Sequence, residues 1–62
     1  MSVYKDLKGM IEKDLYSNAM EMQEKLDYFY QKRKKITLEQ HQELTALLEK
    51  KELEKIEGAA AQ

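Results

Sequence analysis

The stretch Lys34-Lys35-Ile36-Thr37-Leu38-Glu39-Gln40-His41-Gln42-Glu43-Leu44 carries the clearest helix-start signal in the chain. The Thr37 hydroxyl can accept the backbone N–H of Gln40, and the Gln40 side chain can reach back to the backbone N–H of Thr37, as in a capping box. Ile36 stands just before this cap, but the position that would complete a hydrophobic staple holds His41. The stretch therefore predicts a helix that begins immediately after Thr37.

The apolar pattern elsewhere also has the period of a helix. The chain contains no proline and only two glycines, and its apolar residues do not alternate as they would in a strand. In the first third they form a face made of Tyr4, Leu7, Ile11 and Leu15, and in the second third the face continues through Met22, Leu26 and Phe29. We expect an all-α fold, a small helical hairpin or three-helix assembly, with helices over about residues 3–15, 19–34 and 38–57.

Two interpretations compete at Tyr16-Ser17-Asn18. Asn18 followed by Glu21 resembles a second N-cap, which would separate two helices. Alternatively, apolar positions spaced by eleven residues, such as Leu15 and Leu26, suit one nearly straight helix through both segments. We favour the break, which gives three helices.

The last helix carries more large apolar side chains than one neighbouring helix can cover. At 100° per residue they occupy more than one narrow stripe. Leu44 and Leu48 can face the preceding helices, whereas Leu47 points toward a different surface, so part of this helix is left for a partner. The candidate interaction surface consists of Met20, Tyr28, Leu44, Leu47, Leu48, Leu53 and Ile56.

At 62 residues the chain is short for an independently stable domain. A chain of this size buries only about 60% of the surface that its unfolded form exposes, and it has no cysteine for disulfides. We therefore expect a single helical domain over residues 1–58 that is stabilised as a homo-oligomer. Gly58 predicts the end of the last helix, and residues 59–62 are expected to form a frayed tail.

The charges of the chain nearly cancel, with 11 Lys and Arg against 12 Asp and Glu and a formal net charge of -1 at pH 7. The molecule therefore has no overall field that would attract nucleic acid or an anionic membrane. Every uncharged run in the sequence is far shorter than the ~20 apolar residues of a membrane span, and the N-terminus lacks the apolar region of a signal peptide. We expect no membrane association, and the lack of cysteine fits a reducing cytoplasm.

A candidate basic patch ends the second segment and consists of Lys32, Arg33, Lys34 and Lys35. Cations near the C-terminus of a helix offset the negative end of its dipole, which is the simpler interpretation. The alternative is a nucleic-acid contact, because the neighbouring aromatic residues 28–30 could stack on bases. Glu39 and Glu43 follow at once and dilute the positive charge, so nucleic acid is not the expected partner.

The chain offers no constellation of residues for catalysis or metal binding. His41 is the one side chain whose unperturbed pKa lies near neutrality, but the chain has no second histidine and no cysteine to join it. Its neighbour Glu43 lies two residues away, on a different helical face. Carboxylate pairs such as Glu12 with Asp14 are also spaced wrongly for one face. We expect no catalytic, cofactor-binding or metal-binding residues, no cofactor, and no enzyme activity.

An apolar N-terminal helix is followed in order by Leu15-Tyr16-Ser17-Asn18, by Met22-Gln23-Glu24-Lys25-Leu26-Asp27-Tyr28-Phe29, and by Lys35-Ile36-Thr37-Leu38-Glu39-Gln40-His41-Gln42-Glu43-Leu44. Over about residues 4–48 this order resembles the small XkdX-type proteins of phages and prophages of Gram-positive bacteria. Those proteins typically have a basic or glycine-containing turn, then Ile-Thr, an acidic residue and a Tyr-containing helix. This chain differs in having Lys34-Lys35 rather than glycine at the turn, and His41 where an aromatic is common. The resemblance implies a phage protein from the tail and lysis gene region and brings no active-site residues with it.

We therefore expect a non-enzymatic phage or prophage accessory protein, associated with the tail, that acts by helix-mediated protein–protein interaction. The resemblance implies a location in the bacterial host cytoplasm or on the virion. The expected partners are further copies of the chain and a phage structural protein or a host bacterial protein. The alternative is a small phage-encoded inhibitor or regulator of a host bacterial protein. A nucleic-acid-binding module that uses the basic patch is the weaker alternative.

Overall fold

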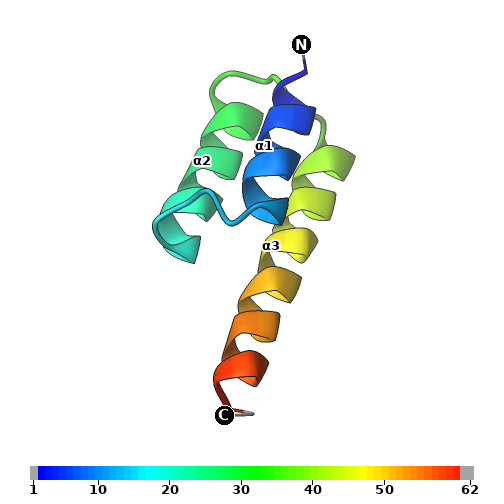
Figure 1. The fold of residues 1–62 in the computed structure, drawn as a ribbon. Helices are drawn as coiled ribbons and strands as arrows, with labels where there is room; N and C mark the ends of the chain where they lie inside the picture. Colours follow the sequence, from blue (N-terminus) through cyan, green and yellow to red (C-terminus); the bar gives the residue numbers. More distant parts are fainter. Residues whose placement is uncertain (1, 61–62) are drawn as a thin grey trace.

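The chain folds into three α-helices: α1 (Val3–Glu12), α2 (Ala19–Gln31) and α3 (Leu38–Ala60). The structure is a computed structural model that describes the backbone of residues 2–60 and the side chains of residues 2–56. Both shorter helices pack against α3, and the second half of α3 projects beyond the other two (Figure 1). The predicted all-α class is confirmed, since the described residues contain helices, turns and loops and no strand.

Side-chain caps fix where α2 and α3 begin. The Asn18 side chain accepts the backbone N–H of Glu21 at 2.8 Å. At α3 the backbone N–H of Gln40 donates to Thr37 Oγ1 at 3.1 Å, and the backbone N–H of Thr37 donates to Gln40 Oε1 at 2.9 Å. Both predicted caps are therefore confirmed, and the alternative of one continuous helix through the first two segments is wrong.

The α1 helix ends at Glu12, three residues earlier than predicted. Asp14 adopts a left-handed backbone conformation with φ 56°. Its backbone N–H donates to the carbonyl of Ile11 at 3.2 Å, and the backbone N–H of Leu15 donates to the carbonyl of Met10 at 2.8 Å. This pair of hydrogen bonds is a Schellman motif, which usually has glycine at the left-handed position. Because the helix has ended, Leu15 is exposed rather than on the predicted buried face.

The α2 helix ends at Gln31, again three residues earlier than predicted. The backbone N–H groups of Lys32 and Arg33 both donate to the carbonyl of Tyr28, at 2.9 and 3.1 Å. Lys34 then takes a left-handed conformation with φ 53°, which turns the chain toward α3. Glycine would adopt such a positive φ without steric cost.

Replacing Lys34 with glycine is expected to raise the free energy of unfolding by roughly 0.5–1 kcal/mol, because the left-handed conformation strains an L side chain. The matched control is Lys35→Gly, since Lys35 is the next residue and does not have a positive φ. At that position glycine should only add freedom to the unfolded chain and lower stability. Urea denaturation followed by circular dichroism measures both changes, and an equal loss in the two variants would contradict the expected relief of strain.

The α3 helix continues through Gly58 to Ala60, so the predicted stop at Gly58 is wrong. A single glycine weakens a helix by about 1 kcal/mol relative to alanine and need not end it. Of the predicted tail, residues 59 and 60 are helical, and residues 61–62 lie outside the described residues.

The core lies where the three helices meet. No polar side chain is buried among those described. The seven buried side chains are all apolar and are those of Leu7, Ile11, Met22, Leu26, Ile36, Leu44 and Leu48. Ile36 comes from the loop between α2 and α3 rather than from a helix. A single-layer core of this size leaves the rest of each helix with one solvent-facing side, so side chains beyond the core are available for contacts with other molecules.

Candidate interaction surface

The structure divides the predicted interaction surface into buried and exposed members. Leu44 and Leu48 are buried in the core, although Leu48 also lines the groove between α2 and α3 that is described below. Leu47 was expected to point away from the core, but it is half-buried and packs against the core cluster. The remaining four are exposed large apolar side chains, namely Met20, Tyr28, Leu53 and Ile56.

Three of the exposed side chains meet in one groove between α2 and α3, which we call the α2–α3 groove. Met20 is 74% exposed, Leu53 58% and Ile56 64%. The groove has a volume of about 640 Å³, and its apolar lining consists of Ala19, Met20, Leu48, Leu53 and Ile56. Tyr28 lies nine residues further along α2 than Ala19 and does not line it. Three residues of the surface predicted from the sequence therefore form the exposed apolar lining of the groove, and Leu48 lies in both the lining and the core.

The polar lining of the α2–α3 groove carries only negative charge. It consists of Gln23 and Glu24 from α2 and Glu49 and Glu52 from α3. Glu24 and Glu49 are exposed. Among the described side chains, neither has a cationic group within ion-pair distance. The groove is thus an apolar surface with a carboxylate on each wall.

A polar cluster joins the segment between α1 and α2 to α3 at the edge of the groove. The Tyr16 hydroxyl donates to Glu52 Oε2 at 3.1 Å. Lys55 Nζ lies 3.0 Å from Glu52 Oε2 and 3.3 Å from Asp14 Oδ1, and it donates to the Tyr16 hydroxyl at 3.1 Å. The hydrogen bond to Glu52 and then that to Tyr16 raise the pKa of Lys55, and the same Lys55 contact lowers the pKa of Glu52.

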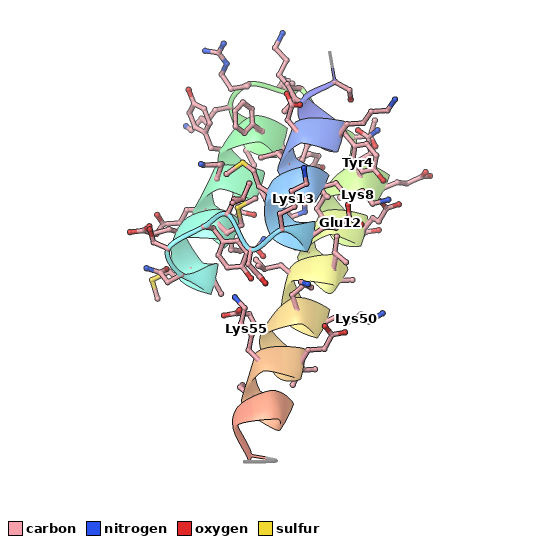
Figure 2. The ribbon with its side chains drawn as sticks, in the orientation of Figure 1. Tyr4, Lys8, Glu12, Lys13, Lys50 and Lys55 are labelled. Carbon is pink, nitrogen blue, oxygen red and sulfur yellow. The ribbon has the colours of Figure 1, made fainter. Side chains whose placement is uncertain are left out.

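Glu52 belongs both to this cluster and to the lining of the groove. Figure 2 shows Lys55 and Lys50 on opposite sides of the projecting part of α3, with Lys55 on the side toward the α1–α2 segment. Sequence reasoning did not identify the cluster, because Tyr16 and Glu52 are 36 residues apart. Only the spacing of Glu52 and Lys55 (i,i+3) on α3 could have suggested an ion pair.

His41 joins α3 to α2. Its Nε2 lies 2.6 Å from Asp27 Oδ1, and its ring lies 4.9 Å from the ring of Tyr30. Gln23 Nε2 also donates to Asp27 Oδ1, at 3.1 Å. An ionised carboxylate only accepts hydrogen bonds, so His41 carries a hydrogen on Nε2. The hydrogen bond from His41 lowers the pKa of Asp27.

The lowered pKa of Asp27 makes part of the folding stability depend on pH. A carboxyl group whose pKa is lower in the folded state stabilises the fold above its unfolded pKa, about 3.9. This contribution is lost as the pH falls through the folded pKa. Asp27→Asn is therefore expected to lower the free energy of unfolding at pH 6 by no more than about 1 kcal/mol, because Asp27 is partly exposed to solvent. The difference from the unmutated protein should shrink below about pH 4.

Urea denaturation at pH 6 and at pH 3 measures this difference. Glu54→Gln is the control, because Glu54 is exposed and has no ion pair or side-chain hydrogen bond among the described residues. The Glu54 variant should show little effect at either pH. A deficit in the Asp27 variant that is equally large at pH 3 would show that ionisation of Asp27 does not matter.

The four residues of the basic patch are all exposed. They lie in and beside the loop between α2 and α3, at the end of the molecule opposite to the projecting part of α3 (Figure 1). Among the described residues, none of the four takes part in an ion pair. The basic patch and the α2–α3 groove are therefore separate surfaces.

The described part of the chain contains no group of three or more His, Asp or Glu side chains placed to hold a metal ion. Within residues 2–60, none of the helices has the length and apolarity needed to cross a bilayer. No family model, no curated protein and no solved structure matches this chain. The α2–α3 groove is therefore the feature of the molecule from which a function can be inferred.

Proposed function

We propose that this protein is a non-enzymatic interaction protein that takes a helix of a partner protein into the α2–α3 groove. The observation that carries the proposal is the open apolar lining, in which Met20, Leu53 and Ile56 are each more than half exposed. Small soluble proteins rarely leave contiguous apolar surface in contact with water unless it binds something. Burying these side chains would contribute about 25 cal/mol per Å² of apolar area removed from water.

A helix suits the groove better than a small molecule does. Sites for small molecules usually enclose most of the ligand surface, whereas this groove is largely open to solvent. Its α3 wall runs from Leu48 to Ile56, a helical length of roughly 12 Å at 1.5 Å per residue. An amphipathic helix that docks in such a groove uses apolar anchors at positions i, i+3 or i+4, and i+7.

The biological setting in this proposal comes from the XkdX-type resemblance over about residues 4–48. It is that of a phage or prophage accessory protein, associated with the tail, in the host cytoplasm or on the virion. In that setting the partner is a phage structural protein. A host bacterial protein as partner would instead correspond to a phage-encoded inhibitor or regulator.

Affinity capture with a matched pair of variants tests the proposal. Met20→Glu places a charge in the groove, whereas Leu38→Glu changes an exposed apolar residue at the far end of the bundle. We expect the unmutated protein and the Leu38 variant to capture a tail or baseplate protein from phage-producing cells. The Met20 variant should lose it, since a carboxylate in an apolar contact must be desolvated.

Mass spectrometry of cells with and without phage production separates the outcomes. One host protein, captured in both conditions and lost only in the Met20 variant, would favour the inhibitor. If the Met20→Glu variant captured the same protein as efficiently as the unmutated protein, docking in the groove would be contradicted.

A further inference from the structure

We propose that the helix held in the α2–α3 groove is cationic, with Lys or Arg on both flanks of its apolar face. This inference rests on the function proposed above and specifies the chemistry of the partner. Its basis is that the three charged side chains that line the groove, Glu24, Glu49 and Glu52, are all carboxylates. Glu24 lies on the α2 wall, and the other two lie on the α3 wall.

Two of these carboxylates remain available to a partner. Glu52 is held by Lys55 at 3.0 Å and by the Tyr16 hydroxyl at 3.1 Å. Glu24 and Glu49 are exposed and have no cationic neighbour within ion-pair distance among the described side chains. One of these carboxylates comes from each of the two helices that line the groove, so a docked helix meets negative charge from both α2 and α3. Lys and Arg bury their apolar stems and keep the charged ends in water, which suits a groove lined in this way.

The same charges argue against a second copy of the chain in this groove. In a two-fold dimer each copy presents the same patch to the other. Glu24 and Glu49 of one copy would then enter an interface that already holds the same two carboxylates of the other. Like charges brought together in an interface oppose binding. A polyanion such as nucleic acid is disfavoured at this surface for the same reason.

Two designed 14-residue peptides test the charge of the partner. Both carry leucine at i, i+4, i+7 and i+11 and alanine elsewhere on the inner face. One has lysine on both flanks, and the other has glutamate at the same positions. Binding is measured by fluorescence anisotropy of the labelled peptides at 50 mM and 300 mM salt. We expect the lysine peptide to bind at least about fivefold more tightly at low salt, because each rim ion pair contributes modestly, and the preference should shrink at high salt.

The decisive test replaces the two available carboxylates of the groove with lysines. The double variant E24K/E49K should reverse the preference, so that the glutamate peptide binds more tightly. The matched control is E12K/E39K, which changes the net charge equally at two exposed carboxylates that do not line the groove. That control should keep the preference for lysine. Circular dichroism checks that all variants remain helical.

The other outcomes separate this inference from the proposed function. Equal binding of both peptides, lost in Met20→Glu, would overturn the cationic partner and leave helix docking in place. Binding of neither peptide, together with a dimer in sedimentation equilibrium that Met20→Glu dissociates, would identify the occupant as a second copy and overturn the cationic partner. Binding of neither peptide by a monomeric protein would overturn both the cationic partner and the helix-docking groove.

Discussion

Replacing Leu44 with alanine is expected to lower the free energy of unfolding by about 2–5 kcal/mol. Leu44 is fully buried in the core formed by the three helices, and its truncation removes apolar contacts and leaves a cavity. A domain of 62 residues has a total stability on the order of 3–9 kcal/mol. The variant should therefore be close to unfolded at 37 °C, and urea denaturation followed by circular dichroism at 10 °C measures the loss.

Leu38→Ala is the control for Leu44→Ala. The substitution removes the same atoms from a leucine of the same helix, but Leu38 is 52% exposed. Its truncation should alter stability by no more than about 0.5 kcal/mol, as for most surface substitutions. An equal loss of stability in the two variants would mean that Leu44 is not in the core. It would then belong to the exposed surface predicted from the sequence.

Leu53→Glu is expected to weaken binding of the lysine peptide at least about thirtyfold, because truncating or charging a central anchor of an interface typically costs 2 kcal/mol or more. Its effect on stability should stay within about 0.5 kcal/mol, since Leu53 is more than half exposed. Fluorescence anisotropy and urea denaturation on the same sample measure the two effects separately.

Leu48→Ala is the comparison for Leu53→Glu, because Leu48 belongs to both the core and the groove. Its truncation should lower the free energy of unfolding by about 2 kcal/mol or more and should also weaken binding of the lysine peptide. A Leu53 variant that unfolded as easily as the Leu48 variant would show that Leu53 packs within the chain rather than facing a partner.

Helix starts were predictable from the sequence because caps are local. Asn18 with Glu21, and Thr37 with Gln40, each place a side-chain acceptor three residues before the amide that it caps. The choice of face on α1 and α2 was also local, since helical spacing placed Ile11 and Leu26 on buried sides.

Helix ends and long-range contacts were not predictable in the same way. The left-handed residues that end α1 and turn the chain after α2 are Asp14 and Lys34, and neither is glycine, the residue that usually signals such a position. Burial of Ile36 depends on how the loop crosses the bundle. The contact between Tyr16 and Glu52 depends on the relative placement of two segments, and helical spacing within each segment carries no information about it.

Only part of the candidate surface could be predicted from the sequence, for a related reason. Periodicity groups the apolar residues of α3 into faces, but it does not say which face the other helices cover. On a helical wheel Leu53 lies about 180° from Leu44, and the structure buries Leu44 and exposes Leu53. The position of α2 beside α3 decides this, and it also brings Met20 to Leu53 and Ile56.

Because α3 passes from the bundle into solvent, we expect its amide hydrogens to fall into two kinetic classes. Around Leu44 and Leu48 the helix is held by the packed core, so we expect the amides there to exchange with solvent when the whole domain opens. The side chains of residues 53–56 are exposed, and isolated helical turns are marginal in water, so we expect exchange there to follow local fraying. A helix seated in the groove would slow exchange toward Ile56, and the boundary between the two classes along α3 would then report occupancy directly.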